Sequence, residues 1–252
     1  MSCSDIPEAM QRTALLTGRE GLERIRRGRV IVFGVGGVGS WCAEALARAG
    51  VGVITVVDSD TVAPGNINRQ LVADFTTVGR LKATVMAQRI HAVNPDCHIH
   101  AVAGRYDAVS ADSFSLDSYD VIVDAIDSVD AKADLIIRAT RCRRARLVSS
   151  MGAALKPDIT AIAVAEFNKA YGCALARALR NRFKKTGMFP ARKFKCVYCP
   201  QSVANHAECA EAETDATPNG TKRVNGTLVT TTATFGLLLA QLALERLMAT
   251  ND

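Results

Sequence analysis

The sequence predicts an α/β fold with a doubly wound, mainly parallel sheet. Short apolar runs rich in Val and Ile alternate with longer amphipathic segments from residue 30 to residue 149, and this alternation is typical of a parallel sheet covered by helices. A glycine-rich turn follows the first apolar run, and acidic residues close two others. With 252 residues, 48% of them hydrophobic and 22% charged, the chain can bury a substantial core as one domain.

Local patterns set the order of the elements in this first part. An amphipathic helix is expected over residues 8–27, before the continuous apolar run Val30-Ile-Val-Phe33 that suits a strand buried on both faces. Further strands are expected where β-branched residues concentrate, and helices where apolar residues recur every three to four positions. The strands are predicted at 30–34, 53–57, 97–103, 120–124 and 146–149, and the helices at 38–49, 79–92 and 130–143, with a polar loop through residue 70.

The pattern changes after Gly152, where basic residues become frequent. The remaining segments predict a strand over 159–167, a basic helix over 173–185, a strand over 193–198, a polar loop over 207–224 and a final helix over 230–248. The final segment is apolar, but its threonines, Gln241 and the pair Glu245-Arg246 interrupt it, so a buried or dimer-facing helix is favoured over a membrane span.

A glycine turn between the first strand and the next helix predicts a nucleotide site. The run Gly34-Val-Gly36-Gly37-Val-Gly39 allows a tight turn whose N–H groups, together with the helix N-terminus, can face a phosphate. Asp58 closes the following strand, where it can accept a hydrogen bond from a ribose hydroxyl. These features alone also permit an NAD-binding redox or regulatory protein.

A polar and cationic phrase after that strand favours a triphosphate over a nicotinamide cofactor. A site that stabilises charge developing on phosphates needs donors and cations. The chain offers them as Asn66, Asn68, Arg69, Gln70 and, further on, Lys82.

A second acidic strand end adds a candidate metal ligand. Asp127 and Ser128 follow the strand that ends at Asp124, and the carboxyl edge of an open α/β sheet is where ligands bind. Asp127 is therefore the predicted magnesium ligand. Asp124 is interpreted as a structural strand-end residue, and Asp60 as either a nucleotide contact or a loop cap.

Together, these motifs resemble the adenylating enzymes related to ubiquitin activation. The resemblance covers roughly residues 8–165 and is carried by an ordered set of residues: Gly34 to Gly39, Asp58, Asn66, Asn68-Arg69-Gln70, Lys82 and Asp127. It implies ATP and magnesium as cofactors, a twofold homodimer, and catalytic roles for Arg69, Lys82, Asp127 and Arg12, the last reaching into the partner's nucleotide site. A monovalent cation and a sulfur-relay partner protein are left open.

Within that family, the N-terminal run 12–18, the Ala-Ile-Asp-Ser phrase at 125–128 and the basic C-terminal half are most similar to the tRNA threonylcarbamoyladenosine dehydratases. That branch implies adenylation of a carboxylate on a modified adenosine of tRNA, followed by ring closure with release of AMP. The alternative is an adenylyltransferase for a ubiquitin-like sulfur-carrier protein. The domain then divides into an N-terminal helical arm (1–27), a nucleotide-binding core (28–165) and a basic part that faces substrate and forms the dimer (166–252).

The cysteines separate these two alternatives. Cys196-Val-Tyr-Cys199 has the spacing of half a zinc site, and the sulfur-carrier branch uses two such pairs. Here a second pair is missing, and only His206 and Cys209 lie nearby in an irregular spacing. Zinc at Cys196 and Cys199 is therefore the minor hypothesis and reduced thiols the major one, as expected in the cytoplasm for a chain whose N-terminus lacks an export signal.

The uneven charge favours RNA as the partner. Net charge is +6, and basic residues cluster in two places, a pattern typical of phosphate-backbone binding, although a solvated helix face is the common alternative. The predicted RNA-binding residues are Arg177, Arg180, Arg182, Lys184, Lys185, Arg192, Lys193 and Lys195, and the second cluster contains Arg138, Arg141, Arg143, Arg144 and Arg146.

Overall fold

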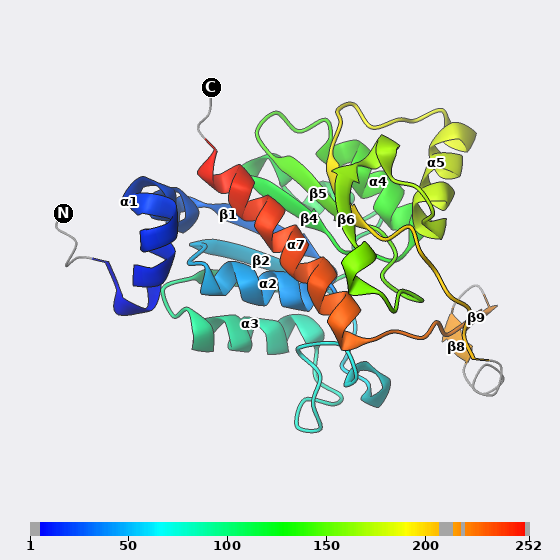
Figure 1. The fold of residues 1–252 in the computed structure, drawn as a ribbon, viewed down its shortest axis with the longest axis horizontal. Coiled ribbons are helices and arrows are strands. Elements are labelled where there is room, and N and C mark those ends of the chain that lie inside the picture. The colour runs from blue at the N-terminus through cyan, green and yellow to red at the C-terminus, as the bar shows by residue number, and fades with distance from the viewer. Residues whose placement is uncertain (1–5, 207–213, 218–219, 250–252) are drawn as a thin grey trace.

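The fold is organised around one seven-stranded sheet with the strand order β3-β2-β1-β4-β5-β7-β6 (Figure 1). The computed structural model describes residues 6–206, 214–217 and 220–249. All neighbouring strands are parallel except the edge pair, β6 and β7. The strands are β1 (Arg29–Phe33), β2 (Val53–Val57), β3 (His98–Val102), β4 (Val121–Asp124), β5 (Arg146–Ser150), β6 (Ala163–Glu166) and β7 (Lys195–Tyr198).

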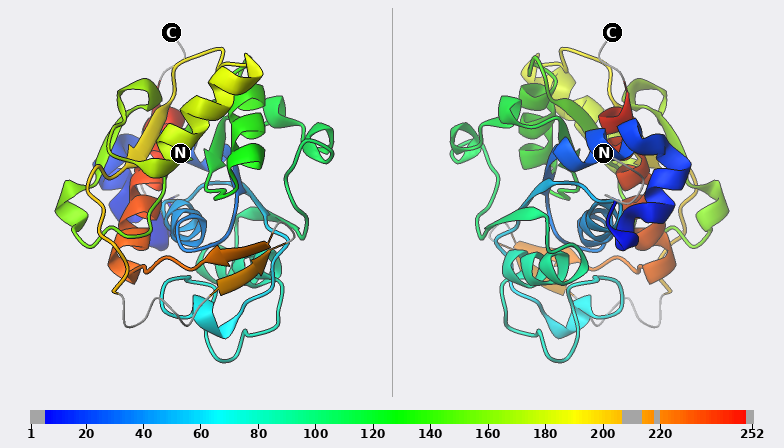
Figure 2. Two further views of the ribbon diagram at one scale, coloured as in Figure 1. Left: turned by 90° about the vertical axis from the view of Figure 1, so that its right-hand side faces the viewer. Right: turned by 90° about the vertical axis from the view of Figure 1, so that its left-hand side faces the viewer.

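Helices cover both faces of this sheet (Figure 2). One face carries α1, α2, α3 and α7, and the other carries α4 and α5. The bounds are α1 (Gln11–Arg27), α2 (Gly39–Arg48), α3 (Lys82–Val93), α4 (Val129–Ala139), α5 (Ala174–Thr186) and α7 (Val229–Met248). Short 3-10 turns lie at Glu8–Met10, Pro64–Asn66, Ala111–Ser113, Leu116–Ser118, Ile159–Ala161 and Phe167–Lys169.

Alternation along the strands builds a separate core on each face. In β1, Val30 and Val32 contribute to the core beneath α2, α3 and α7, whereas Ile31 and Phe33 contribute to the core beneath α4 and α5. These side chains are fully buried. Continuous apolar runs are therefore required, because successive side chains of a central strand enter opposite cores.

The C-terminal helix α7 packs closely on α2, the helix that begins at the glycine turn. A Cβ on Gly236 would lie 2.5 Å from the Val38 oxygen and 2.8 Å from the Trp41 Cβ, so glycine is needed for this approach. Among the described helices, none has the length and hydropathy needed to cross a membrane.

Most of the predicted elements are confirmed, with local corrections. The strand predicted at 159–167 is wrong in its first half, because a 3-10 turn at Ile159–Ala161 precedes the four-residue β6. The predicted helix 8–27 begins as a 3-10 turn and breaks at Gly18, whose φ of +72° is not helical. The helix predicted at 79–92 begins only at Lys82.

The polar loop predicted over 207–224 is also partly wrong. It contains a two-stranded antiparallel hairpin, β8 (Thr214–Thr217) and β9 (Gly220–Arg223). Residues 207–213 and 218–219, including the Cys209 considered for zinc, lie outside the described residues. The hairpin has no alternating apolar face, so hydrophobic periodicity could not reveal it.

Candidate nucleotide-binding site

A cleft of about 210 Å³ opens at the carboxyl edge of the sheet, where β1, β2, β3 and β4 end. The strand order reverses between β1 and β4, and open α/β sheets bind ligands at such a switch point. The lining includes five residues predicted from the sequence: Gly34, Asp58, Asp60, Asp127 and Ser128. The fold thus brings the predicted glycine turn and both acidic strand ends into one site.

The glycine turn is fixed by close backbone contacts at two of its positions. Gly34 has a φ of +87°, and a Cβ there would lie 2.7 Å from the Ala125 oxygen. A Cβ on Gly39 would lie 1.8 Å from the Gly34 oxygen. Gly36 is less crowded, since a Cβ there would meet only the Gln70 side chain within 4 Å. The turn therefore needs glycine at 34 and 39 for its own geometry, and Gly36 leaves room for a phosphate.

Asp58 is held at the cleft by two backbone N–H groups. Its Oδ2 accepts from Val35 N at 2.6 Å and its Oδ1 from Asp60 N at 2.9 Å. Burial raises the pKa of Asp58, and the hydrogen bonds from Val35 and Asp60 oppose that rise. A carboxylate kept in place at low solvent exposure is well suited to accept from ribose hydroxyls.

The Asn-x-Asn-Arg-Gln phrase folds as a compact turn beside the glycine loop. Arg69 Nη1 donates to the Gly65 oxygen at 2.7 Å and to Asn68 Oδ1 at 2.9 Å, and in the described part of the chain no carboxylate forms a salt bridge with it. The buried Gln70 Oε1 has no hydrogen-bond partner among the described residues. Two groups here therefore each lack a kind of partner: within the described residues, the Arg69 guanidinium has no carboxylate, and the Gln70 amide oxygen has no hydrogen bond. A polar ligand bound at this site would supply partners for both.

Lys82 begins α3 and reaches the same edge of the sheet. Its side chain is 7% exposed, and its Nζ lies 3.0 Å from Oδ2 of the largely exposed Asp60. Asp60 lines the cleft, so this ion pair places a buried ammonium beside the site.

Asp124 is buried at the end of β4, whereas Asp127 lines the cleft. Asp124 is fully buried, lies 2.8 Å from Lys132 Nζ and accepts from Ser149 Oγ at 2.7 Å. Asp124 and Lys132 also form a clamp on the backbone of Ile126: its N–H donates to Asp124, and its carbonyl accepts from Lys132. This clamp fixes the loop that carries Asp127 into the cleft.

The cleft suits magnesium only in company with a phosphate ligand. No group of three or more His, Cys, Asp or Glu side chains in the described ranges is arranged to hold a metal ion. Mg²⁺ is usually bound by one or two carboxylates, waters and substrate phosphates rather than by a protein cage. Asp127 at the cleft is a carboxylate that could bind Mg²⁺ in this way, together with phosphate oxygens.

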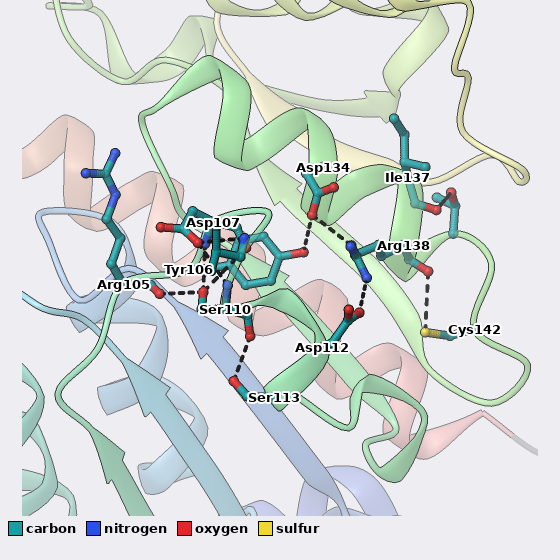
Figure 3. Close-up of polar contacts among 12 residues, drawn as sticks. Arg105, Tyr106, Asp107, Ser110, Asp112, Ser113, Asp134, Ile137, Arg138 and Cys142 are labelled. Carbon is teal, nitrogen blue, oxygen red and sulfur yellow. Dashed lines mark hydrogen bonds and ion pairs between the residues drawn. The ribbon is translucent and has the colours of Figure 1, made fainter. Parts of the chain in front are cut away.

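The third side of the cleft was not predicted from the sequence. Gly104, Arg105 and Tyr106, after β3, line it. Figure 3 shows the network that holds this segment: Tyr106 Oη donates to Asp134 Oδ2 at 2.8 Å, and Arg138 Nε lies 2.9 Å from the same oxygen. No local pattern predicts this wall, because the segment has neither a glycine motif nor a strand-end carboxylate.

Arg12 lies away from this site. It is an exposed residue of α1, whose C-terminal half packs against α7, and it does not line the cleft. Within one chain, therefore, the structure does not bring Arg12 together with Arg69, Lys82 and Asp127.

The two cysteines considered for zinc face opposite cores. Cys196 belongs to the core beneath α4 and α5, and Cys199 to the core beneath α2, α3 and α7. Both are fully buried, and burial raises the pKa of the Cys196 thiol to about 12. Cys196 lies in β7, and Cys199 directly follows the end of that strand. Because their side chains enter different cores, the structure does not bring the two thiols together into one site.

The basic residues divide into structural and exposed groups. Arg180 donates to the Phe167 and Ala170 carbonyls, and Arg192 to the Thr140 and Cys142 carbonyls. Three others contact carboxylates: Arg182 with Asp130, Lys193 with Glu166, and Lys195 with Glu245. The exposed remainder consists of Arg177, Lys184 and Lys185 on α5.

Comparisons with known proteins show which family the chain resembles. The sequence pattern of the ThiF family matches residues 10–252. The tRNA threonylcarbamoyladenosine dehydratase of Escherichia coli (strain K12) is 38% identical over 250 residues, which cover 94% of this chain and 92% of that protein. The protein of the same name from Bacillus subtilis (strain 168) is 41% identical over 177 residues, covering 70% and 69%.

A solved structure extends the agreement to three dimensions. The crystal structure of E. coli tRNA N6-threonylcarbamoyladenosine dehydratase in complex with ATP is similar with a TM-score of 0.83 at 33% identity. The match covers 96% of this chain and 94% of that one. The family match, the identities and the shared fold lead to one conclusion: the chain belongs to the ThiF family.

Proposed function

We propose that the protein is an ATP-dependent tRNA threonylcarbamoyladenosine dehydratase. The observation that carries this proposal is the single cleft that collects the glycine turn, Asp58 and Asp127, with Arg69 and Lys82 on neighbouring segments. Dehydratases of that name are 38% and 41% identical to this chain, and the related E. coli enzyme has been solved with ATP.

The first chemical step is adenylation. A carboxylate oxygen of the threonylcarbamoyl group attacks the α-phosphorus of ATP, and pyrophosphate leaves with the electrons of the broken P–O bond. Negative charge then builds on the phosphates, and cations fixed in place before reaction stabilise it with little reorganisation. Arg69 and the buried Lys82 would supply this stabilisation.

The second step needs no enzyme nucleophile. A nucleophilic atom of the carbamoyl group attacks the activated carbonyl carbon, a ring closes, and AMP leaves with the electrons of the C–O bond. The carbamoyl N–H loses its proton, so the nucleoside has lost one water overall. Because both reacting groups belong to one modification, holding it still promotes the reaction, and the buried high-pKa Cys196 is not required.

Magnesium would be held by Asp127 together with phosphate oxygens of ATP. When bound there, it would neutralise charge on the phosphates and the leaving pyrophosphate. The clamp made by Asp124 and Lys132 would keep Asp127 oriented for this role.

A homodimer would complete the site with Arg12. Its position on an exposed helix, away from its own cleft, agrees with a contribution to the partner's nucleotide. Leu15 and Leu16, 87% and 89% exposed on the same helix, are apolar side chains that an interface would bury.

Arg177, Lys184 and Lys185 on α5 form the surface that we assign to the tRNA backbone. They are the exposed residues of the predicted basic set that make no salt bridge within the described ranges. Exposed cations without acidic partners are the groups that gain most from neutralising phosphates.

Substitution at the cleft tests the proposal. Arg69→Ala and Asp127→Ala should each lower AMP release by at least about 100-fold while leaving the thermal unfolding midpoint unchanged within a few degrees, because both side chains act on charge that develops in the reaction. Near-normal AMP release in either variant would remove that residue from the proposed machinery. AMP release that requires a ubiquitin-like protein in place of tRNA would instead support a carrier-protein adenylyltransferase.

A further inference from the structure

A second cavity, which shares no lining residue with the nucleotide cleft, is not used by the reaction as described so far. It has a volume of about 410 Å³, within the range of small-molecule sites. Its walls come from three separate segments, residues 155–157, 203–206 and 224–228. Val203 and Leu228, 51% and 55% exposed, are apolar side chains left accessible on these walls.

One wall of this cavity carries a buried cation. Lys156 is 7% exposed, and its Nζ donates to the Gln201 carbonyl. No carboxylate in the described ranges forms a salt bridge with it. An ammonium group has three N–H donors. Burying the ammonium with a single neutral acceptor costs free energy unless an anion or further acceptors also bind it.

The cavity is built by unusual backbone geometry. Leu155 has a φ of +61°, the one non-glycine residue in the described chain with a positive φ. Its N–H donates to the Gly226 oxygen at 2.9 Å, and its carbonyl accepts from Val203 N at 3.0 Å. Asn205 joins the same segments by donating to the Val224 oxygen and accepting from Gly226 N, each at 2.8 Å. Strain that surrounding hydrogen bonds maintain is typical of functional sites.

One direct hydrogen bond joins this cavity to the Asn-x-Asn-Arg-Gln turn beside the glycine loop. Asn68 Nδ2 donates to the carbonyl of Thr227, a wall residue, at 3.1 Å. Thr231 Oγ1 donates to the Lys156 carbonyl at 2.6 Å. The next residue, Thr232, packs on the glycine turn, since a Cβ added to Gly37 would lie 3.1 Å from Thr232 Cγ2. The cavity therefore adjoins the segments that would hold the phosphates.

We propose that this cavity is the subsite for the modified nucleoside, with the apolar walls taking its base and threonyl methyl group and Lys156 binding an anionic oxygen. The assignment rests on the proposed function, whose substrate must present a carboxylate next to the α-phosphate. The anionic oxygen belongs either to the threonyl carboxylate or to a phosphate flanking the nucleoside, and both are bound by the same ammonium chemistry.

Steady-state kinetics of Lys156→Met test the subsite. With an anticodon stem-loop RNA carrying threonylcarbamoyladenosine, KM should rise on the order of 10- to 100-fold, as expected for loss of a charged hydrogen bond, while ATP affinity stays unchanged. Lys169→Met, at a lysine whose side chain is 72% exposed, is the matched control and should leave KM unchanged. Val203→Trp, which fills the cavity from an exposed position, should also raise KM and keeps the test valid if Lys156→Met fails to fold.

Direct binding identifies the anionic group. The free nucleoside N6-threonylcarbamoyladenosine, which has no phosphate, should bind the wild-type enzyme more tightly than Lys156→Met if Lys156 holds the carboxylate. If it holds a phosphate, the loss should appear only with the stem-loop RNA. Unchanged KM and binding in folded Lys156→Met and Val203→Trp would overturn the subsite while leaving the function standing, whereas wild-type enzyme that releases no AMP with the modified RNA would overturn both.

Discussion

At the scale of single residues, Asp58 shows how burial and hydrogen bonding set opposite demands on one carboxyl group. Burial, the larger effect, raises its pKa, and the N–H groups of Val35 and Asp60 counteract that rise. Because the folded-state pKa lies above the unfolded value, the folded protein holds this proton more tightly. The contribution of Asp58 to stability is therefore greatest at acid pH and declines as pH rises through the folded pKa.

Nucleotide binding should depend on pH in the opposite direction. The ionised carboxylate accepts from ribose hydroxyls, so ATP affinity should fall as pH is lowered through the raised pKa of Asp58. Asp58→Asn should weaken ATP binding roughly 10- to 100-fold at neutral pH, as expected for a hydrogen bond to a charged group. Calorimetric titrations across pH check this. Because ATP also titrates, the variant is the control, and an identical pH profile in both proteins would contradict the role given to Asp58.

The buried pair of Asp124 and Lys132 makes a second prediction at this scale. Both side chains are fully buried, and their charges lie 2.8 Å apart. Lys132→Met should lower the free energy of unfolding by about 3–5 kcal/mol, because it leaves an uncompensated buried carboxylate. The double variant Asp124→Asn/Lys132→Met should recover part of that loss. Urea denaturation of the four proteins forms a double-mutant cycle, and additive losses would show that the pair is not coupled.

At the scale of elements, apolar periodicity in the sequence predicted the strands and helices of the core. It did not predict the parts of the cleft whose position depends on tertiary contacts. The run Val30 to Phe33 predicted β1 because each residue enters a core. The position of Tyr106 at the cleft could not be predicted in this way, because it depends on Asp134 and Arg138, 28 and 32 positions further along the chain. It also depends on the packing of the Tyr106 ring against the Phe33 ring, with centroids 4.9 Å apart. Glycine and strand-end motifs are local, whereas the third wall of the cleft is not.

Several arginines of the two charge clusters bind groups of their own chain. Arg144 and Arg146 precede or begin β5, at the sheet edge opposite the cleft, and Arg144 pairs with Asp120 while Arg146 donates to backbone carbonyls. Arg180 and Arg192 likewise bind carbonyls of their own chain. A sequence counts such arginines as free charge, because the carbonyls that accept from them come from other elements.

The exposed face of α5 therefore has a specific expected effect on RNA binding. The triple variant Arg177→Ala/Lys184→Ala/Lys185→Ala should weaken tRNA binding, and the slope of log affinity against log salt should become shallower by about 2 to 3, as expected for three lost phosphate contacts. Filter binding over a range of salt concentrations measures this, with ATP affinity as the control for folding. An unchanged slope would place the RNA elsewhere.

At the scale of the whole molecule, the segments that follow the carboxyl ends of the strands form both the nucleotide cleft and the second cavity. The cleft occupies the ends of β1 to β4, and the second cavity is formed by the segments after β5 and β7 and before α7. Asn68, in the turn beside the glycine loop, donates to Thr227 in the wall of the second cavity. The sequence predicted the nucleotide half, but the second cavity depends on contacts between residues 155, 203 and 226 that no local pattern encodes.

The proposed dimer makes a complementation prediction. Arg12→Ala and Asp127→Ala should each be inactive alone, because each removes one contribution from both sites. In a mixed dimer, one site would combine an intact Arg12 with an intact Asp127. Randomly reassembled mixtures should therefore recover about a quarter of the wild-type activity. Absence of recovery in verified mixed dimers would show that Arg12 does not act across the interface.

The central claim is that this cleft adenylates a carboxylate carried by modified tRNA. The most direct measurement follows AMP release from ATP and magnesium with tRNA that carries threonylcarbamoyladenosine, against unmodified tRNA, while the mass of the nucleoside is recorded. The account predicts AMP release that depends on the modification and a nucleoside lighter by one water. AMP release without RNA dependence, or an unchanged nucleoside mass, would contradict it.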